Sequence, residues 1–214
     1  METDSFLTIG EHSEGIFKDK GSRFLAFAYP VSSENDIIKI LEKVRKEYHD
    51  ARHHCYAWRL GADLKNFRSN DDGEPGNSAG KPILGQIQAF HLTNVLVIVV
   101  RYFGGTLLGV GGLIQAYKTA SFEALKNAKI VKKFIYESYK LSFAYEDMNL
   151  VMKVMKDLNL EQSDQKFGLN CEMIVKVKIS EKIKLTTAFR PDSSVKMKIF
   201  IPAMKSFQEN MNNT

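Results

Sequence analysis

The sequence predicts an α+β protein built from two domains. Residues 1–130 alternate short strand patterns with amphipathic helix patterns, and the apolar run 94–100 indicates a central strand that is covered on both faces. Near residues 129–133 the pattern starts again, and the remaining chain reads as strand, helix, strand, strand, helix, strand. This βαββαβ order is the split βαβ arrangement of ferredoxin-like domains. We therefore predict an N-terminal α/β domain at 1–130 and a ferredoxin-like C-terminal domain at 131–214.

The first elements expected in the N-terminal domain are strands within 6–10 and 15–31, which are apolar and bounded by turn formers. Ser33 is a candidate N-cap for a helix whose apolar stripe, at helical spacing, ends at Tyr48. The segment 54–60 alternates two unlike sets of side chains, so we expect a strand there.

Residues 61–81 hold many turn-forming residues and no apolar periodicity. We expect a long loop, which in a compact domain is usually functional or mobile. After this loop we expect a helix with Pro82 in its first turn, and a second helix after Gly112.

The elements expected in the C-terminal domain follow from the same periodicities. They are a strand at 133–145, a helix at 145–160, strands at 160–167 and 170–179, a helix at 181–190 and a strand at 194–202. Such a module leaves one sheet face open, and nucleic-acid-binding domains often use that face. We expect the polar tail 204–214 to fray.

The composition is that of an ordinary soluble globular protein, with 44% hydrophobic and 26% charged residues. The longest uncharged apolar run is about seven residues, far short of the roughly 20 that a membrane-spanning helix needs. The acidic, polar N-terminus is typical neither of a signal peptide nor of a transit peptide. Cys55 and Cys171 lie far apart with no CxxC motif, which indicates a reducing compartment. We therefore expect a cytoplasmic protein that does not associate with membranes.

The positive charge of the chain is concentrated in the predicted C-terminal domain. Residues 1–130 carry 16 Lys/Arg against 15 Asp/Glu, whereas residues 131–214 carry 14 against 10. This bias indicates either a solvated lysine-rich surface or an attraction for polyanions. The aromatic residues Tyr136, Tyr139 and Phe143 are candidate exposed stacking groups, although core packing is the more common role of such residues.

Five glycines lie in the segment Gly104–Gly112, directly after the apolar run. It is not a Walker A loop, because Val110 and Gly111 stand where the lysine and the hydroxyl residue are required. Two interpretations stay open. Either the open backbone N–H groups, the following helix and Arg101 form a seat for an anion, or the glycines allow close packing and Arg101 pairs with an internal carboxylate. The carboxylates considered for such a pair are Asp71, Asp72 and Glu74.

Two further clusters carry reactive side chains. On a strand, His53 and Cys55 would share a face, which allows a pair of metal ligands or a nucleophile with its base. Neither has a local signature, so partly buried, hydrogen-bonded histidines are the favoured interpretation. Residues 71–74 place three carboxylates around Gly73, either as a plain turn or as part of a binding groove. We predict no metal, no cofactor and no catalytic residue.

Three segments together resemble the IMPACT/YigZ family of uncharacterised, translation-linked proteins. They are HDARHHCYAWRLG at 49–61, NDDGEPGNSAGKPIL at 70–84 and NVLVIVVRYFGGTLLGVGGLIQAY at 94–117. The resemblance covers roughly residues 15–130 and is specific, because the motifs are long and stand in the family's order. The remaining chain is similar to the family's small C-terminal domain.

The resemblance implies an N-terminal domain like the second domain of a small-subunit ribosomal protein, similar also to domain IV of elongation factor G. It implies a C-terminal domain like domain V of that factor. Because both comparators work on ribosomal RNA, it also implies that the chain binds RNA or the ribosome. Eukaryotic members of the family act in translational control through protein partners, so a translation-control protein is a second expected partner. The resemblance implies no catalytic activity.

We therefore expect an RNA- or ribosome-associated protein with a regulatory role in translation. Two alternatives stay open. One is an enzyme or small-anion binder whose groove lies between residues 71–74, His53/His54 and the turn 101–112, and the other is a protein-interaction module. The candidate binding residues are Asp50, His53, His54, Asp71, Asp72, Glu74, Lys81, Arg101, Tyr102, Gly104, Gly105, Gly109, Gly111 and Gly112.

Overall fold

The computed structural model describes residues 4–190 and 193–201, and it has the mixed helix and sheet content expected of an α+β protein. The chain divides into two compact units, and the division lies between Lys133 and Phe134. Ser5–Lys133 form the first unit, and the second unit contains Asp4 and the chain from Phe134 onward. Among the described residues, none of the helices combines the length and the hydropathy that crossing a membrane requires.

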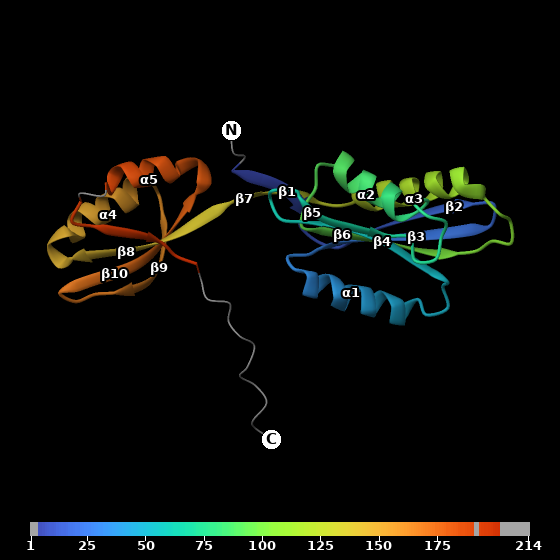
Figure 1. Ribbon diagram of the computed structural model, residues 1–214, viewed down its shortest axis with the longest axis horizontal. Helices are drawn as coiled ribbons and strands as arrows, with labels where there is room; N and C mark the ends of the chain where they lie inside the picture. The colour runs from blue at the N-terminus through green and yellow to red at the C-terminus, as the bar shows by residue number, and fades with distance from the viewer. Residues whose placement is uncertain (1–3, 191–192, 202–214) are drawn as a thin grey trace, which may run out of the picture. The chain divides into compact units, whose positions relative to one another are not determined.

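The first unit contains a five-stranded antiparallel sheet with helices on both faces (Figure 1). The strand order in this sheet is β2-β3-β6-β4-β5. The elements are β1 (Ser5–Ile9), β2 (Ser13–Asp19), β3 (Ser22–Pro30), α1 (Glu34–Glu47), β4 (His53–Leu60), β5 (Asn66–Asn70), α2 (Gly80–Ala89), β6 (Val95–Tyr102), α3 (Gly109–Lys126) and β7 (Ile130–Phe134), the last of which pairs with β1.

β6 is the central strand of this sheet, as the apolar run predicts. The side chains from Val95 to Val100 are all fully buried. Val95, Val97 and Val99 contribute to the core under α2 and α3, whereas the alternate residues contribute to the core under α1. Because both faces are covered, this strand has no polar alternation.

α1 begins as its sequence predicts. Ser33 occupies the N-cap and its hydroxyl accepts a hydrogen bond from the N–H of Asp36, while the Asp36 carboxylate accepts one from the N–H of Ser33. This reciprocal capping box satisfies two donors that the first helical turn leaves without partners.

The prediction of a continuous loop at 61–81 is wrong for its middle part, because the strand β5 lies there. β5 pairs with β4 at the edge of the sheet through its backbone. Its side chains are exposed or half-buried on both faces, so the strand leaves no apolar alternation to detect. The helix expected after the loop is α2, and Pro82 lies in its first turn as expected.

The second unit has the predicted βαββαβ order, in an antiparallel sheet of strand order β11-β8-β10-β9. α4 and α5 both cover one face of this sheet (Figure 1). The elements are β8 (Tyr136–Ala144), α4 (Met148–Asp157), β9 (Glu161–Lys166), β10 (Asn170–Lys178), α5 (Lys182–Ala188) and β11 (Lys196–Ile199), and a short 3-10 turn precedes each helix.

Two of the three aromatic residues considered as candidate stacking groups are buried. Tyr139 is 3% exposed and Phe143 is 4% exposed, because their positions on β8 face the helices. Tyr136 is 47% exposed. Core packing, the more common role of such residues, therefore applies to Tyr139 and Phe143, and Tyr136 alone of the three is exposed enough to stack on a base. The fraying predicted for the tail 204–214 concerns residues outside the described ranges.

Candidate polar site around the acidic loop

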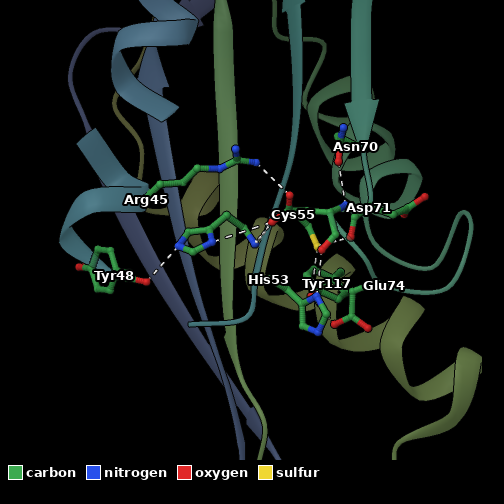
Figure 2. A network of polar contacts seen from close by, with 10 residues as sticks. Arg45, Tyr48, His53, Cys55, Asn70, Asp71, Glu74 and Tyr117 are labelled. Atoms are coloured by element: carbon green, nitrogen blue, oxygen red, sulfur yellow. Dashed lines mark hydrogen bonds and ion pairs between the residues drawn. The ribbon is translucent and has the colours of Figure 1, made fainter. Parts of the chain in front are cut away.

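Residues 71–79, here called the acidic loop, fold back against β4 (Figure 2). Their hydrogen bonds connect four elements of the first unit: α1, β4, β6 and α3. The loop is therefore held in place from several sides.

Asp71 caps α2 from outside the helix. Its Oδ1 accepts hydrogen bonds from the N–H groups of Ala79 at 3.0 Å and Gly80 at 2.8 Å, and its Oδ2 accepts one from Asn77 at 2.8 Å. Ala79 stands at the N-cap and offers no side-chain acceptor, so Asp71 takes that role. Partial burial opposes ionisation, but these backbone donors and the charge of Lys81 outweigh it and hold the pKa of Asp71 below its usual value.

Asp72 joins α1 to the start of β4. Its Oδ1 accepts a hydrogen bond from Arg45 Nη2 at 2.9 Å, and its Oδ2 accepts one from the backbone N–H of His54 at 2.7 Å. Its backbone carbonyl lies 2.9 Å from His53 Nδ1. His54 Nε2 lies 3.1 Å from the carbonyl of Tyr48, and burial lowers the pKa of His54. Both histidines are thus engaged within the fold.

Glu74 and Arg101 form a buried ion pair. Glu74 Oε1 accepts hydrogen bonds from Arg101 Nη1 and from the Tyr117 hydroxyl, each at 2.7 Å, and the two charged side chains are 3% and 8% exposed. Cys55 Sγ lies 3.3 Å from the Tyr117 hydroxyl, and the Arg101 guanidinium lies over the ring of Phe24. Of the three carboxylates considered from the sequence, Glu74 is therefore the one that pairs with Arg101.

One polar atom of this pair stays without a partner. Arg101 Nε is buried and makes no hydrogen bond to any described residue. A buried N–H of this kind raises the free energy of the folded state unless another acceptor reaches it. An anion bound beside Arg101 stays a prediction.

Cys55 is unsuited to act as a nucleophile in this environment. The side chain is fully buried, and burial raises the pKa of the thiol far above its usual value. Burial also raises the pKa of Tyr117 well above the ordinary tyrosine range. Across the described ranges, no three His, Cys, Asp or Glu side chains gather as a metal-binding group.

The glycine-rich turn divides into a packed part and an open part. Gly104 packs on the β2–β3 turn, where a Cβ would lie 1.9 Å from the carbonyl carbon of Gly21. Gly109 begins α3 with a φ of +71°. α3 has no side-chain cap and no acidic residue in its first turn. A Cβ would meet no atom within 4 Å at Gly105, Gly109 or Gly111, and would contact Leu108 at Gly112.

Asp50 and Tyr102 form a hydrogen-bonded pair of their own at the surface. The Tyr102 hydroxyl donates to Asp50 Oδ1 at 2.7 Å, and this bond holds the pKa of Asp50 below its usual value. The guanidinium of Arg23 lies 4.8 Å from the Tyr102 ring centroid. Lys81 is exposed near the start of α2. The binding roles of these residues, and of the acidic loop, stay predictions.

Arg45 and Tyr117 belong to the network although no motif of the sequence marks them as polar site residues. Arg45 lies in the last turn of α1, where a basic residue is common for reasons of helix dipole alone. Tyr117 lies on the apolar face of α3, so its position indicates a core residue and its hydroxyl is the sole hint of a polar role.

Comparison with known proteins shows which family this chain belongs to. A family model described as the Impact N-terminal domain matches residues 20–125, which contain the acidic loop, both histidines and the glycine-rich turn. An IMPACT family member from Haemophilus influenzae is 36% identical over 165 residues, which are 76% of this chain and 79% of that protein. The chain belongs to the IMPACT family.

Two further comparisons agree with this membership. The IMPACT family member YigZ from Escherichia coli is 38% identical over 131 residues, which are 60% of this chain and 64% of that protein. A solved structure described as the crystal structure of a hypothetical protein matches with a TM-score of 0.69 and 27% identity. That match covers 94% of this chain and 100% of the other. The chain is therefore similar in sequence to IMPACT family members and similar in fold to that hypothetical protein.

Proposed function

We propose that this chain acts in translation by binding RNA on the ribosome. Membership in the IMPACT family supports a translation-linked role, since the family's two domains resemble domains of proteins that work on ribosomal RNA. On this proposal the first unit corresponds to the ribosomal-protein-like domain, the second unit to the domain V-like module, and the site of action is the cytoplasm. One observation in the second unit carries the proposal: its open sheet face is rich in lysine.

The lysine face is defined by six residues, Lys140, Lys166, Lys176, Lys178, Lys196 and Lys198. The strand register puts them on one side of the sheet, because Lys196 pairs with Ser142, Lys198 with Lys140 and Lys166 with Glu172 in antiparallel ladders. The alternate residues of β8 and β10 face α4 and α5. The lysine face is therefore opposite the helices.

The charge of the lysine face is balanced in part. Lys140 Nζ lies 2.7 Å from Glu172 Oε1, and this bond holds the pKa of Glu172 below its usual value. Glu161 pairs with Lys176 in the strand register, so lysines outnumber glutamates on this face by six to two. A groove of about 330 Å³ beside Lys140 is lined also by Lys196 and Lys198. These features suit contacts with phosphate groups.

The side chains on the lysine face indicate which groups of an RNA this surface would contact. Tyr136 follows the same alternation and is 47% exposed, whereas the other β8 aromatics lie on the helix side. Phosphate contacts dominate such a surface, so the binding should tolerate changes of sequence and depend strongly on salt.

The test is the binding of ribosomes and of a structured RNA, measured by filter retention between 50 and 200 mM salt. We expect a linear fall of log affinity with log salt concentration, and a weaker slope in the double variant Lys196→Gln/Lys198→Gln. Each lost phosphate contact should reduce the slope by about 0.7 to 0.9. The matched control is Lys153→Gln/Lys156→Gln, which removes the same charge from α4 on the opposite face of the unit.

Binding that is absent, or that ignores salt, contradicts the proposal. If the control variant weakens the slope as much as the lysine-face variant, the net charge of the whole protein attracts the RNA. The lysine face is then not the contact surface.

The arrangement in the first unit gives less support to an enzyme or a small-anion binder. That alternative needs Asp72, Glu74, His53 and Arg101 to converge on an empty groove. Instead Glu74 pairs with Arg101, and Asp72 bonds to Arg45, His54 and His53. Groups that satisfy one another in this way stabilise the fold.

A further inference from the structure

β2 is an edge strand of the first unit's sheet (Figure 1). Residues of β2, β3, the end of α1 and the end of α3 line a groove beside it. Ile16 pairs with Leu25 and Glu14 pairs with Phe27, so these side chains lie on the same face. Tyr48, which ends α1, contacts Phe27 with ring centroids 5.2 Å apart. This space, here called the β2 groove, has a volume of about 490 Å³. That size suits a large side chain or a short peptide segment.

The floor of the β2 groove is apolar and partly uncovered. Phe27 is 5% exposed and Leu25 is half-buried, whereas Ile16 on the edge strand is 51% exposed. α1 packs over β3, β6 and β4 and leaves the β2 side of this face open. An isoleucine left open beside an aromatic floor provides apolar surface for another chain to cover.

Two carboxylates line the β2 groove from different elements. Glu14 comes from β2 and Glu123 from α3, and their side chains are 63% and 36% exposed. Asn127 Nδ2 donates to the carbonyl of Glu14 at 2.9 Å, which fixes the end of α3 against β2. Burial raises the pKa of Tyr48, and the charges of Glu47 and Glu14 raise it further, so Glu14 acts on the aromatic wall of the groove.

Nearby positive groups leave this acidic character in place. His12 Nε2 lies 3.5 Å from Glu14, and Lys126 lies 3.9 Å from Glu123 three residues earlier in the same helix. Exposed pairs of this kind contribute about 0.5 kcal/mol or less, so a better partner can displace them. Lys18 and Arg23 pair with each other further along β2 and β3, beyond Ile16.

We propose that the β2 groove binds a basic segment of a partner protein. One lysine or arginine side chain of that segment lies between Glu14 and Glu123, with its charged group near the Tyr48 ring. A cation gains from both the carboxylates and the ring face, while the aliphatic stem of the side chain packs on Ile16 and Leu25. Glu14 and Glu123 would repel phosphate, which disfavours nucleic acid at this surface. The groove lies in the first unit, so this inference is independent of the lysine face.

The test is amide chemical-shift mapping on the full ¹⁵N-labelled chain. The probe is the peptide acetyl-Gly-Arg-Lys-Arg-Gly-amide, and the acidic counterpart acetyl-Gly-Glu-Asp-Glu-Gly-amide is the charge control. We expect the basic peptide to shift signals of β2, β3 and the end of α3, and the acidic peptide to leave them unchanged. The double variant Glu14→Gln/Glu123→Gln should weaken binding about tenfold, since it removes two interfacial charges.

Two single variants separate general charge from the groove itself. Glu42→Gln removes an exposed carboxylate from α1 outside the groove and should leave the affinity unchanged. Ile16→Thr keeps a β-branched residue on the edge strand, removes apolar contact, and should weaken binding severalfold. Retained amide dispersion shows that each variant is folded.

Four outcomes would overturn the inference. They are no shifts at millimolar basic peptide, shifts spread over the whole surface, equal losses in Glu42→Gln and the double variant, and shifts in β2 with the acidic peptide. Shifts on the lysine face with an RNA probe bear on the proposed function alone.

Discussion

At the scale of single residues, the buried pair of Glu74 and Arg101 is the contact on which the acidic loop most depends. Both charges are almost completely removed from water, and Glu74 Oε1 serves Arg101 and Tyr117 at once. Removing one partner of such a pair leaves the other charge buried without compensation. The pair therefore makes the folded state sensitive to substitution on either side.

We expect Glu74→Gln to lower the free energy of unfolding by about 3–5 kcal/mol, because Arg101 then keeps an uncompensated buried charge. Urea denaturation measures this. Glu42→Gln, which removes an exposed carboxylate, should change stability by less than about 0.5 kcal/mol. The double variant Glu74→Gln/Arg101→Met removes both charges and should lose less than Glu74→Gln alone. Equal losses in Glu74→Gln and Glu42→Gln would show that the pair is not buried in solution.

Asp71 should make stability depend on pH. Its pKa in the folded chain lies below the value near 3.9 of unfolded chains. The ionised carboxylate therefore stabilises the fold above about pH 3.9, and this contribution is lost as the pH falls through the folded-state value. We expect Asp71→Asn to be less stable than the parent chain at pH 7, with a difference that shrinks on acidification. Urea unfolding of both chains across pH measures this difference.

At the scale of elements, the glycine-rich turn joins β6 to α3 and also contacts the β2–β3 turn. Gly104 donates its N–H to Ser22 Oγ at 3.1 Å, and its Cα side faces the backbone of Gly21 with no room for a side chain. Gly111, seven residues later, faces open space. The same residue type therefore has opposite roles within one turn.

We expect Gly104→Ala to destabilise the chain by at least about 1–3 kcal/mol, since the new Cβ forces two backbone turns apart. Gly111→Ala is the matched control in the same segment. It lies within α3, where alanine is favoured over glycine by up to about 1 kcal/mol, so it should raise stability slightly. Thermal unfolding compares the two variants. A neutral Gly104→Ala would mean that the turns separate at no cost.

At the scale of the whole molecule, each unit has a hydrophobic core of its own. The first unit contains two core clusters, one on each face of its sheet, and the second unit contains one cluster under α4 and α5. Units with separate cores generally fold as separate domains. The placement of the domain boundary between the units is thus open to direct test.

We expect residues 1–134, which include all of β7, to fold without the remaining chain. Dispersed amide signals and a single cooperative urea transition of this fragment would support separate domains. In the full chain, Glu74→Gln should then shift the transition of the first unit and leave that of the second unit in place. A fragment that stays unfolded would contradict two independent domains.

The local patterns of the sequence determined most of the architecture. The helical stripe after Ser33, the apolar run of β6 and the βαββαβ order each follow from side-chain spacing within one segment, and the structure confirms them. Spacing is informative there because burial of one face or of both faces imposes a period on the element itself.

The tertiary structure alone decided which distant residues meet. From the sequence, any of three neighbouring carboxylates could pair with Arg101. In the structure Glu74 forms this pair, whereas Asp71 accepts hydrogen bonds from the start of α2 and Asp72 bonds to Arg45. β5 is held at the edge of the sheet by backbone pairing, and its side chains show no alternation of buried and exposed positions. Such contacts depend on where segments far apart in sequence come together, so no local pattern encodes them.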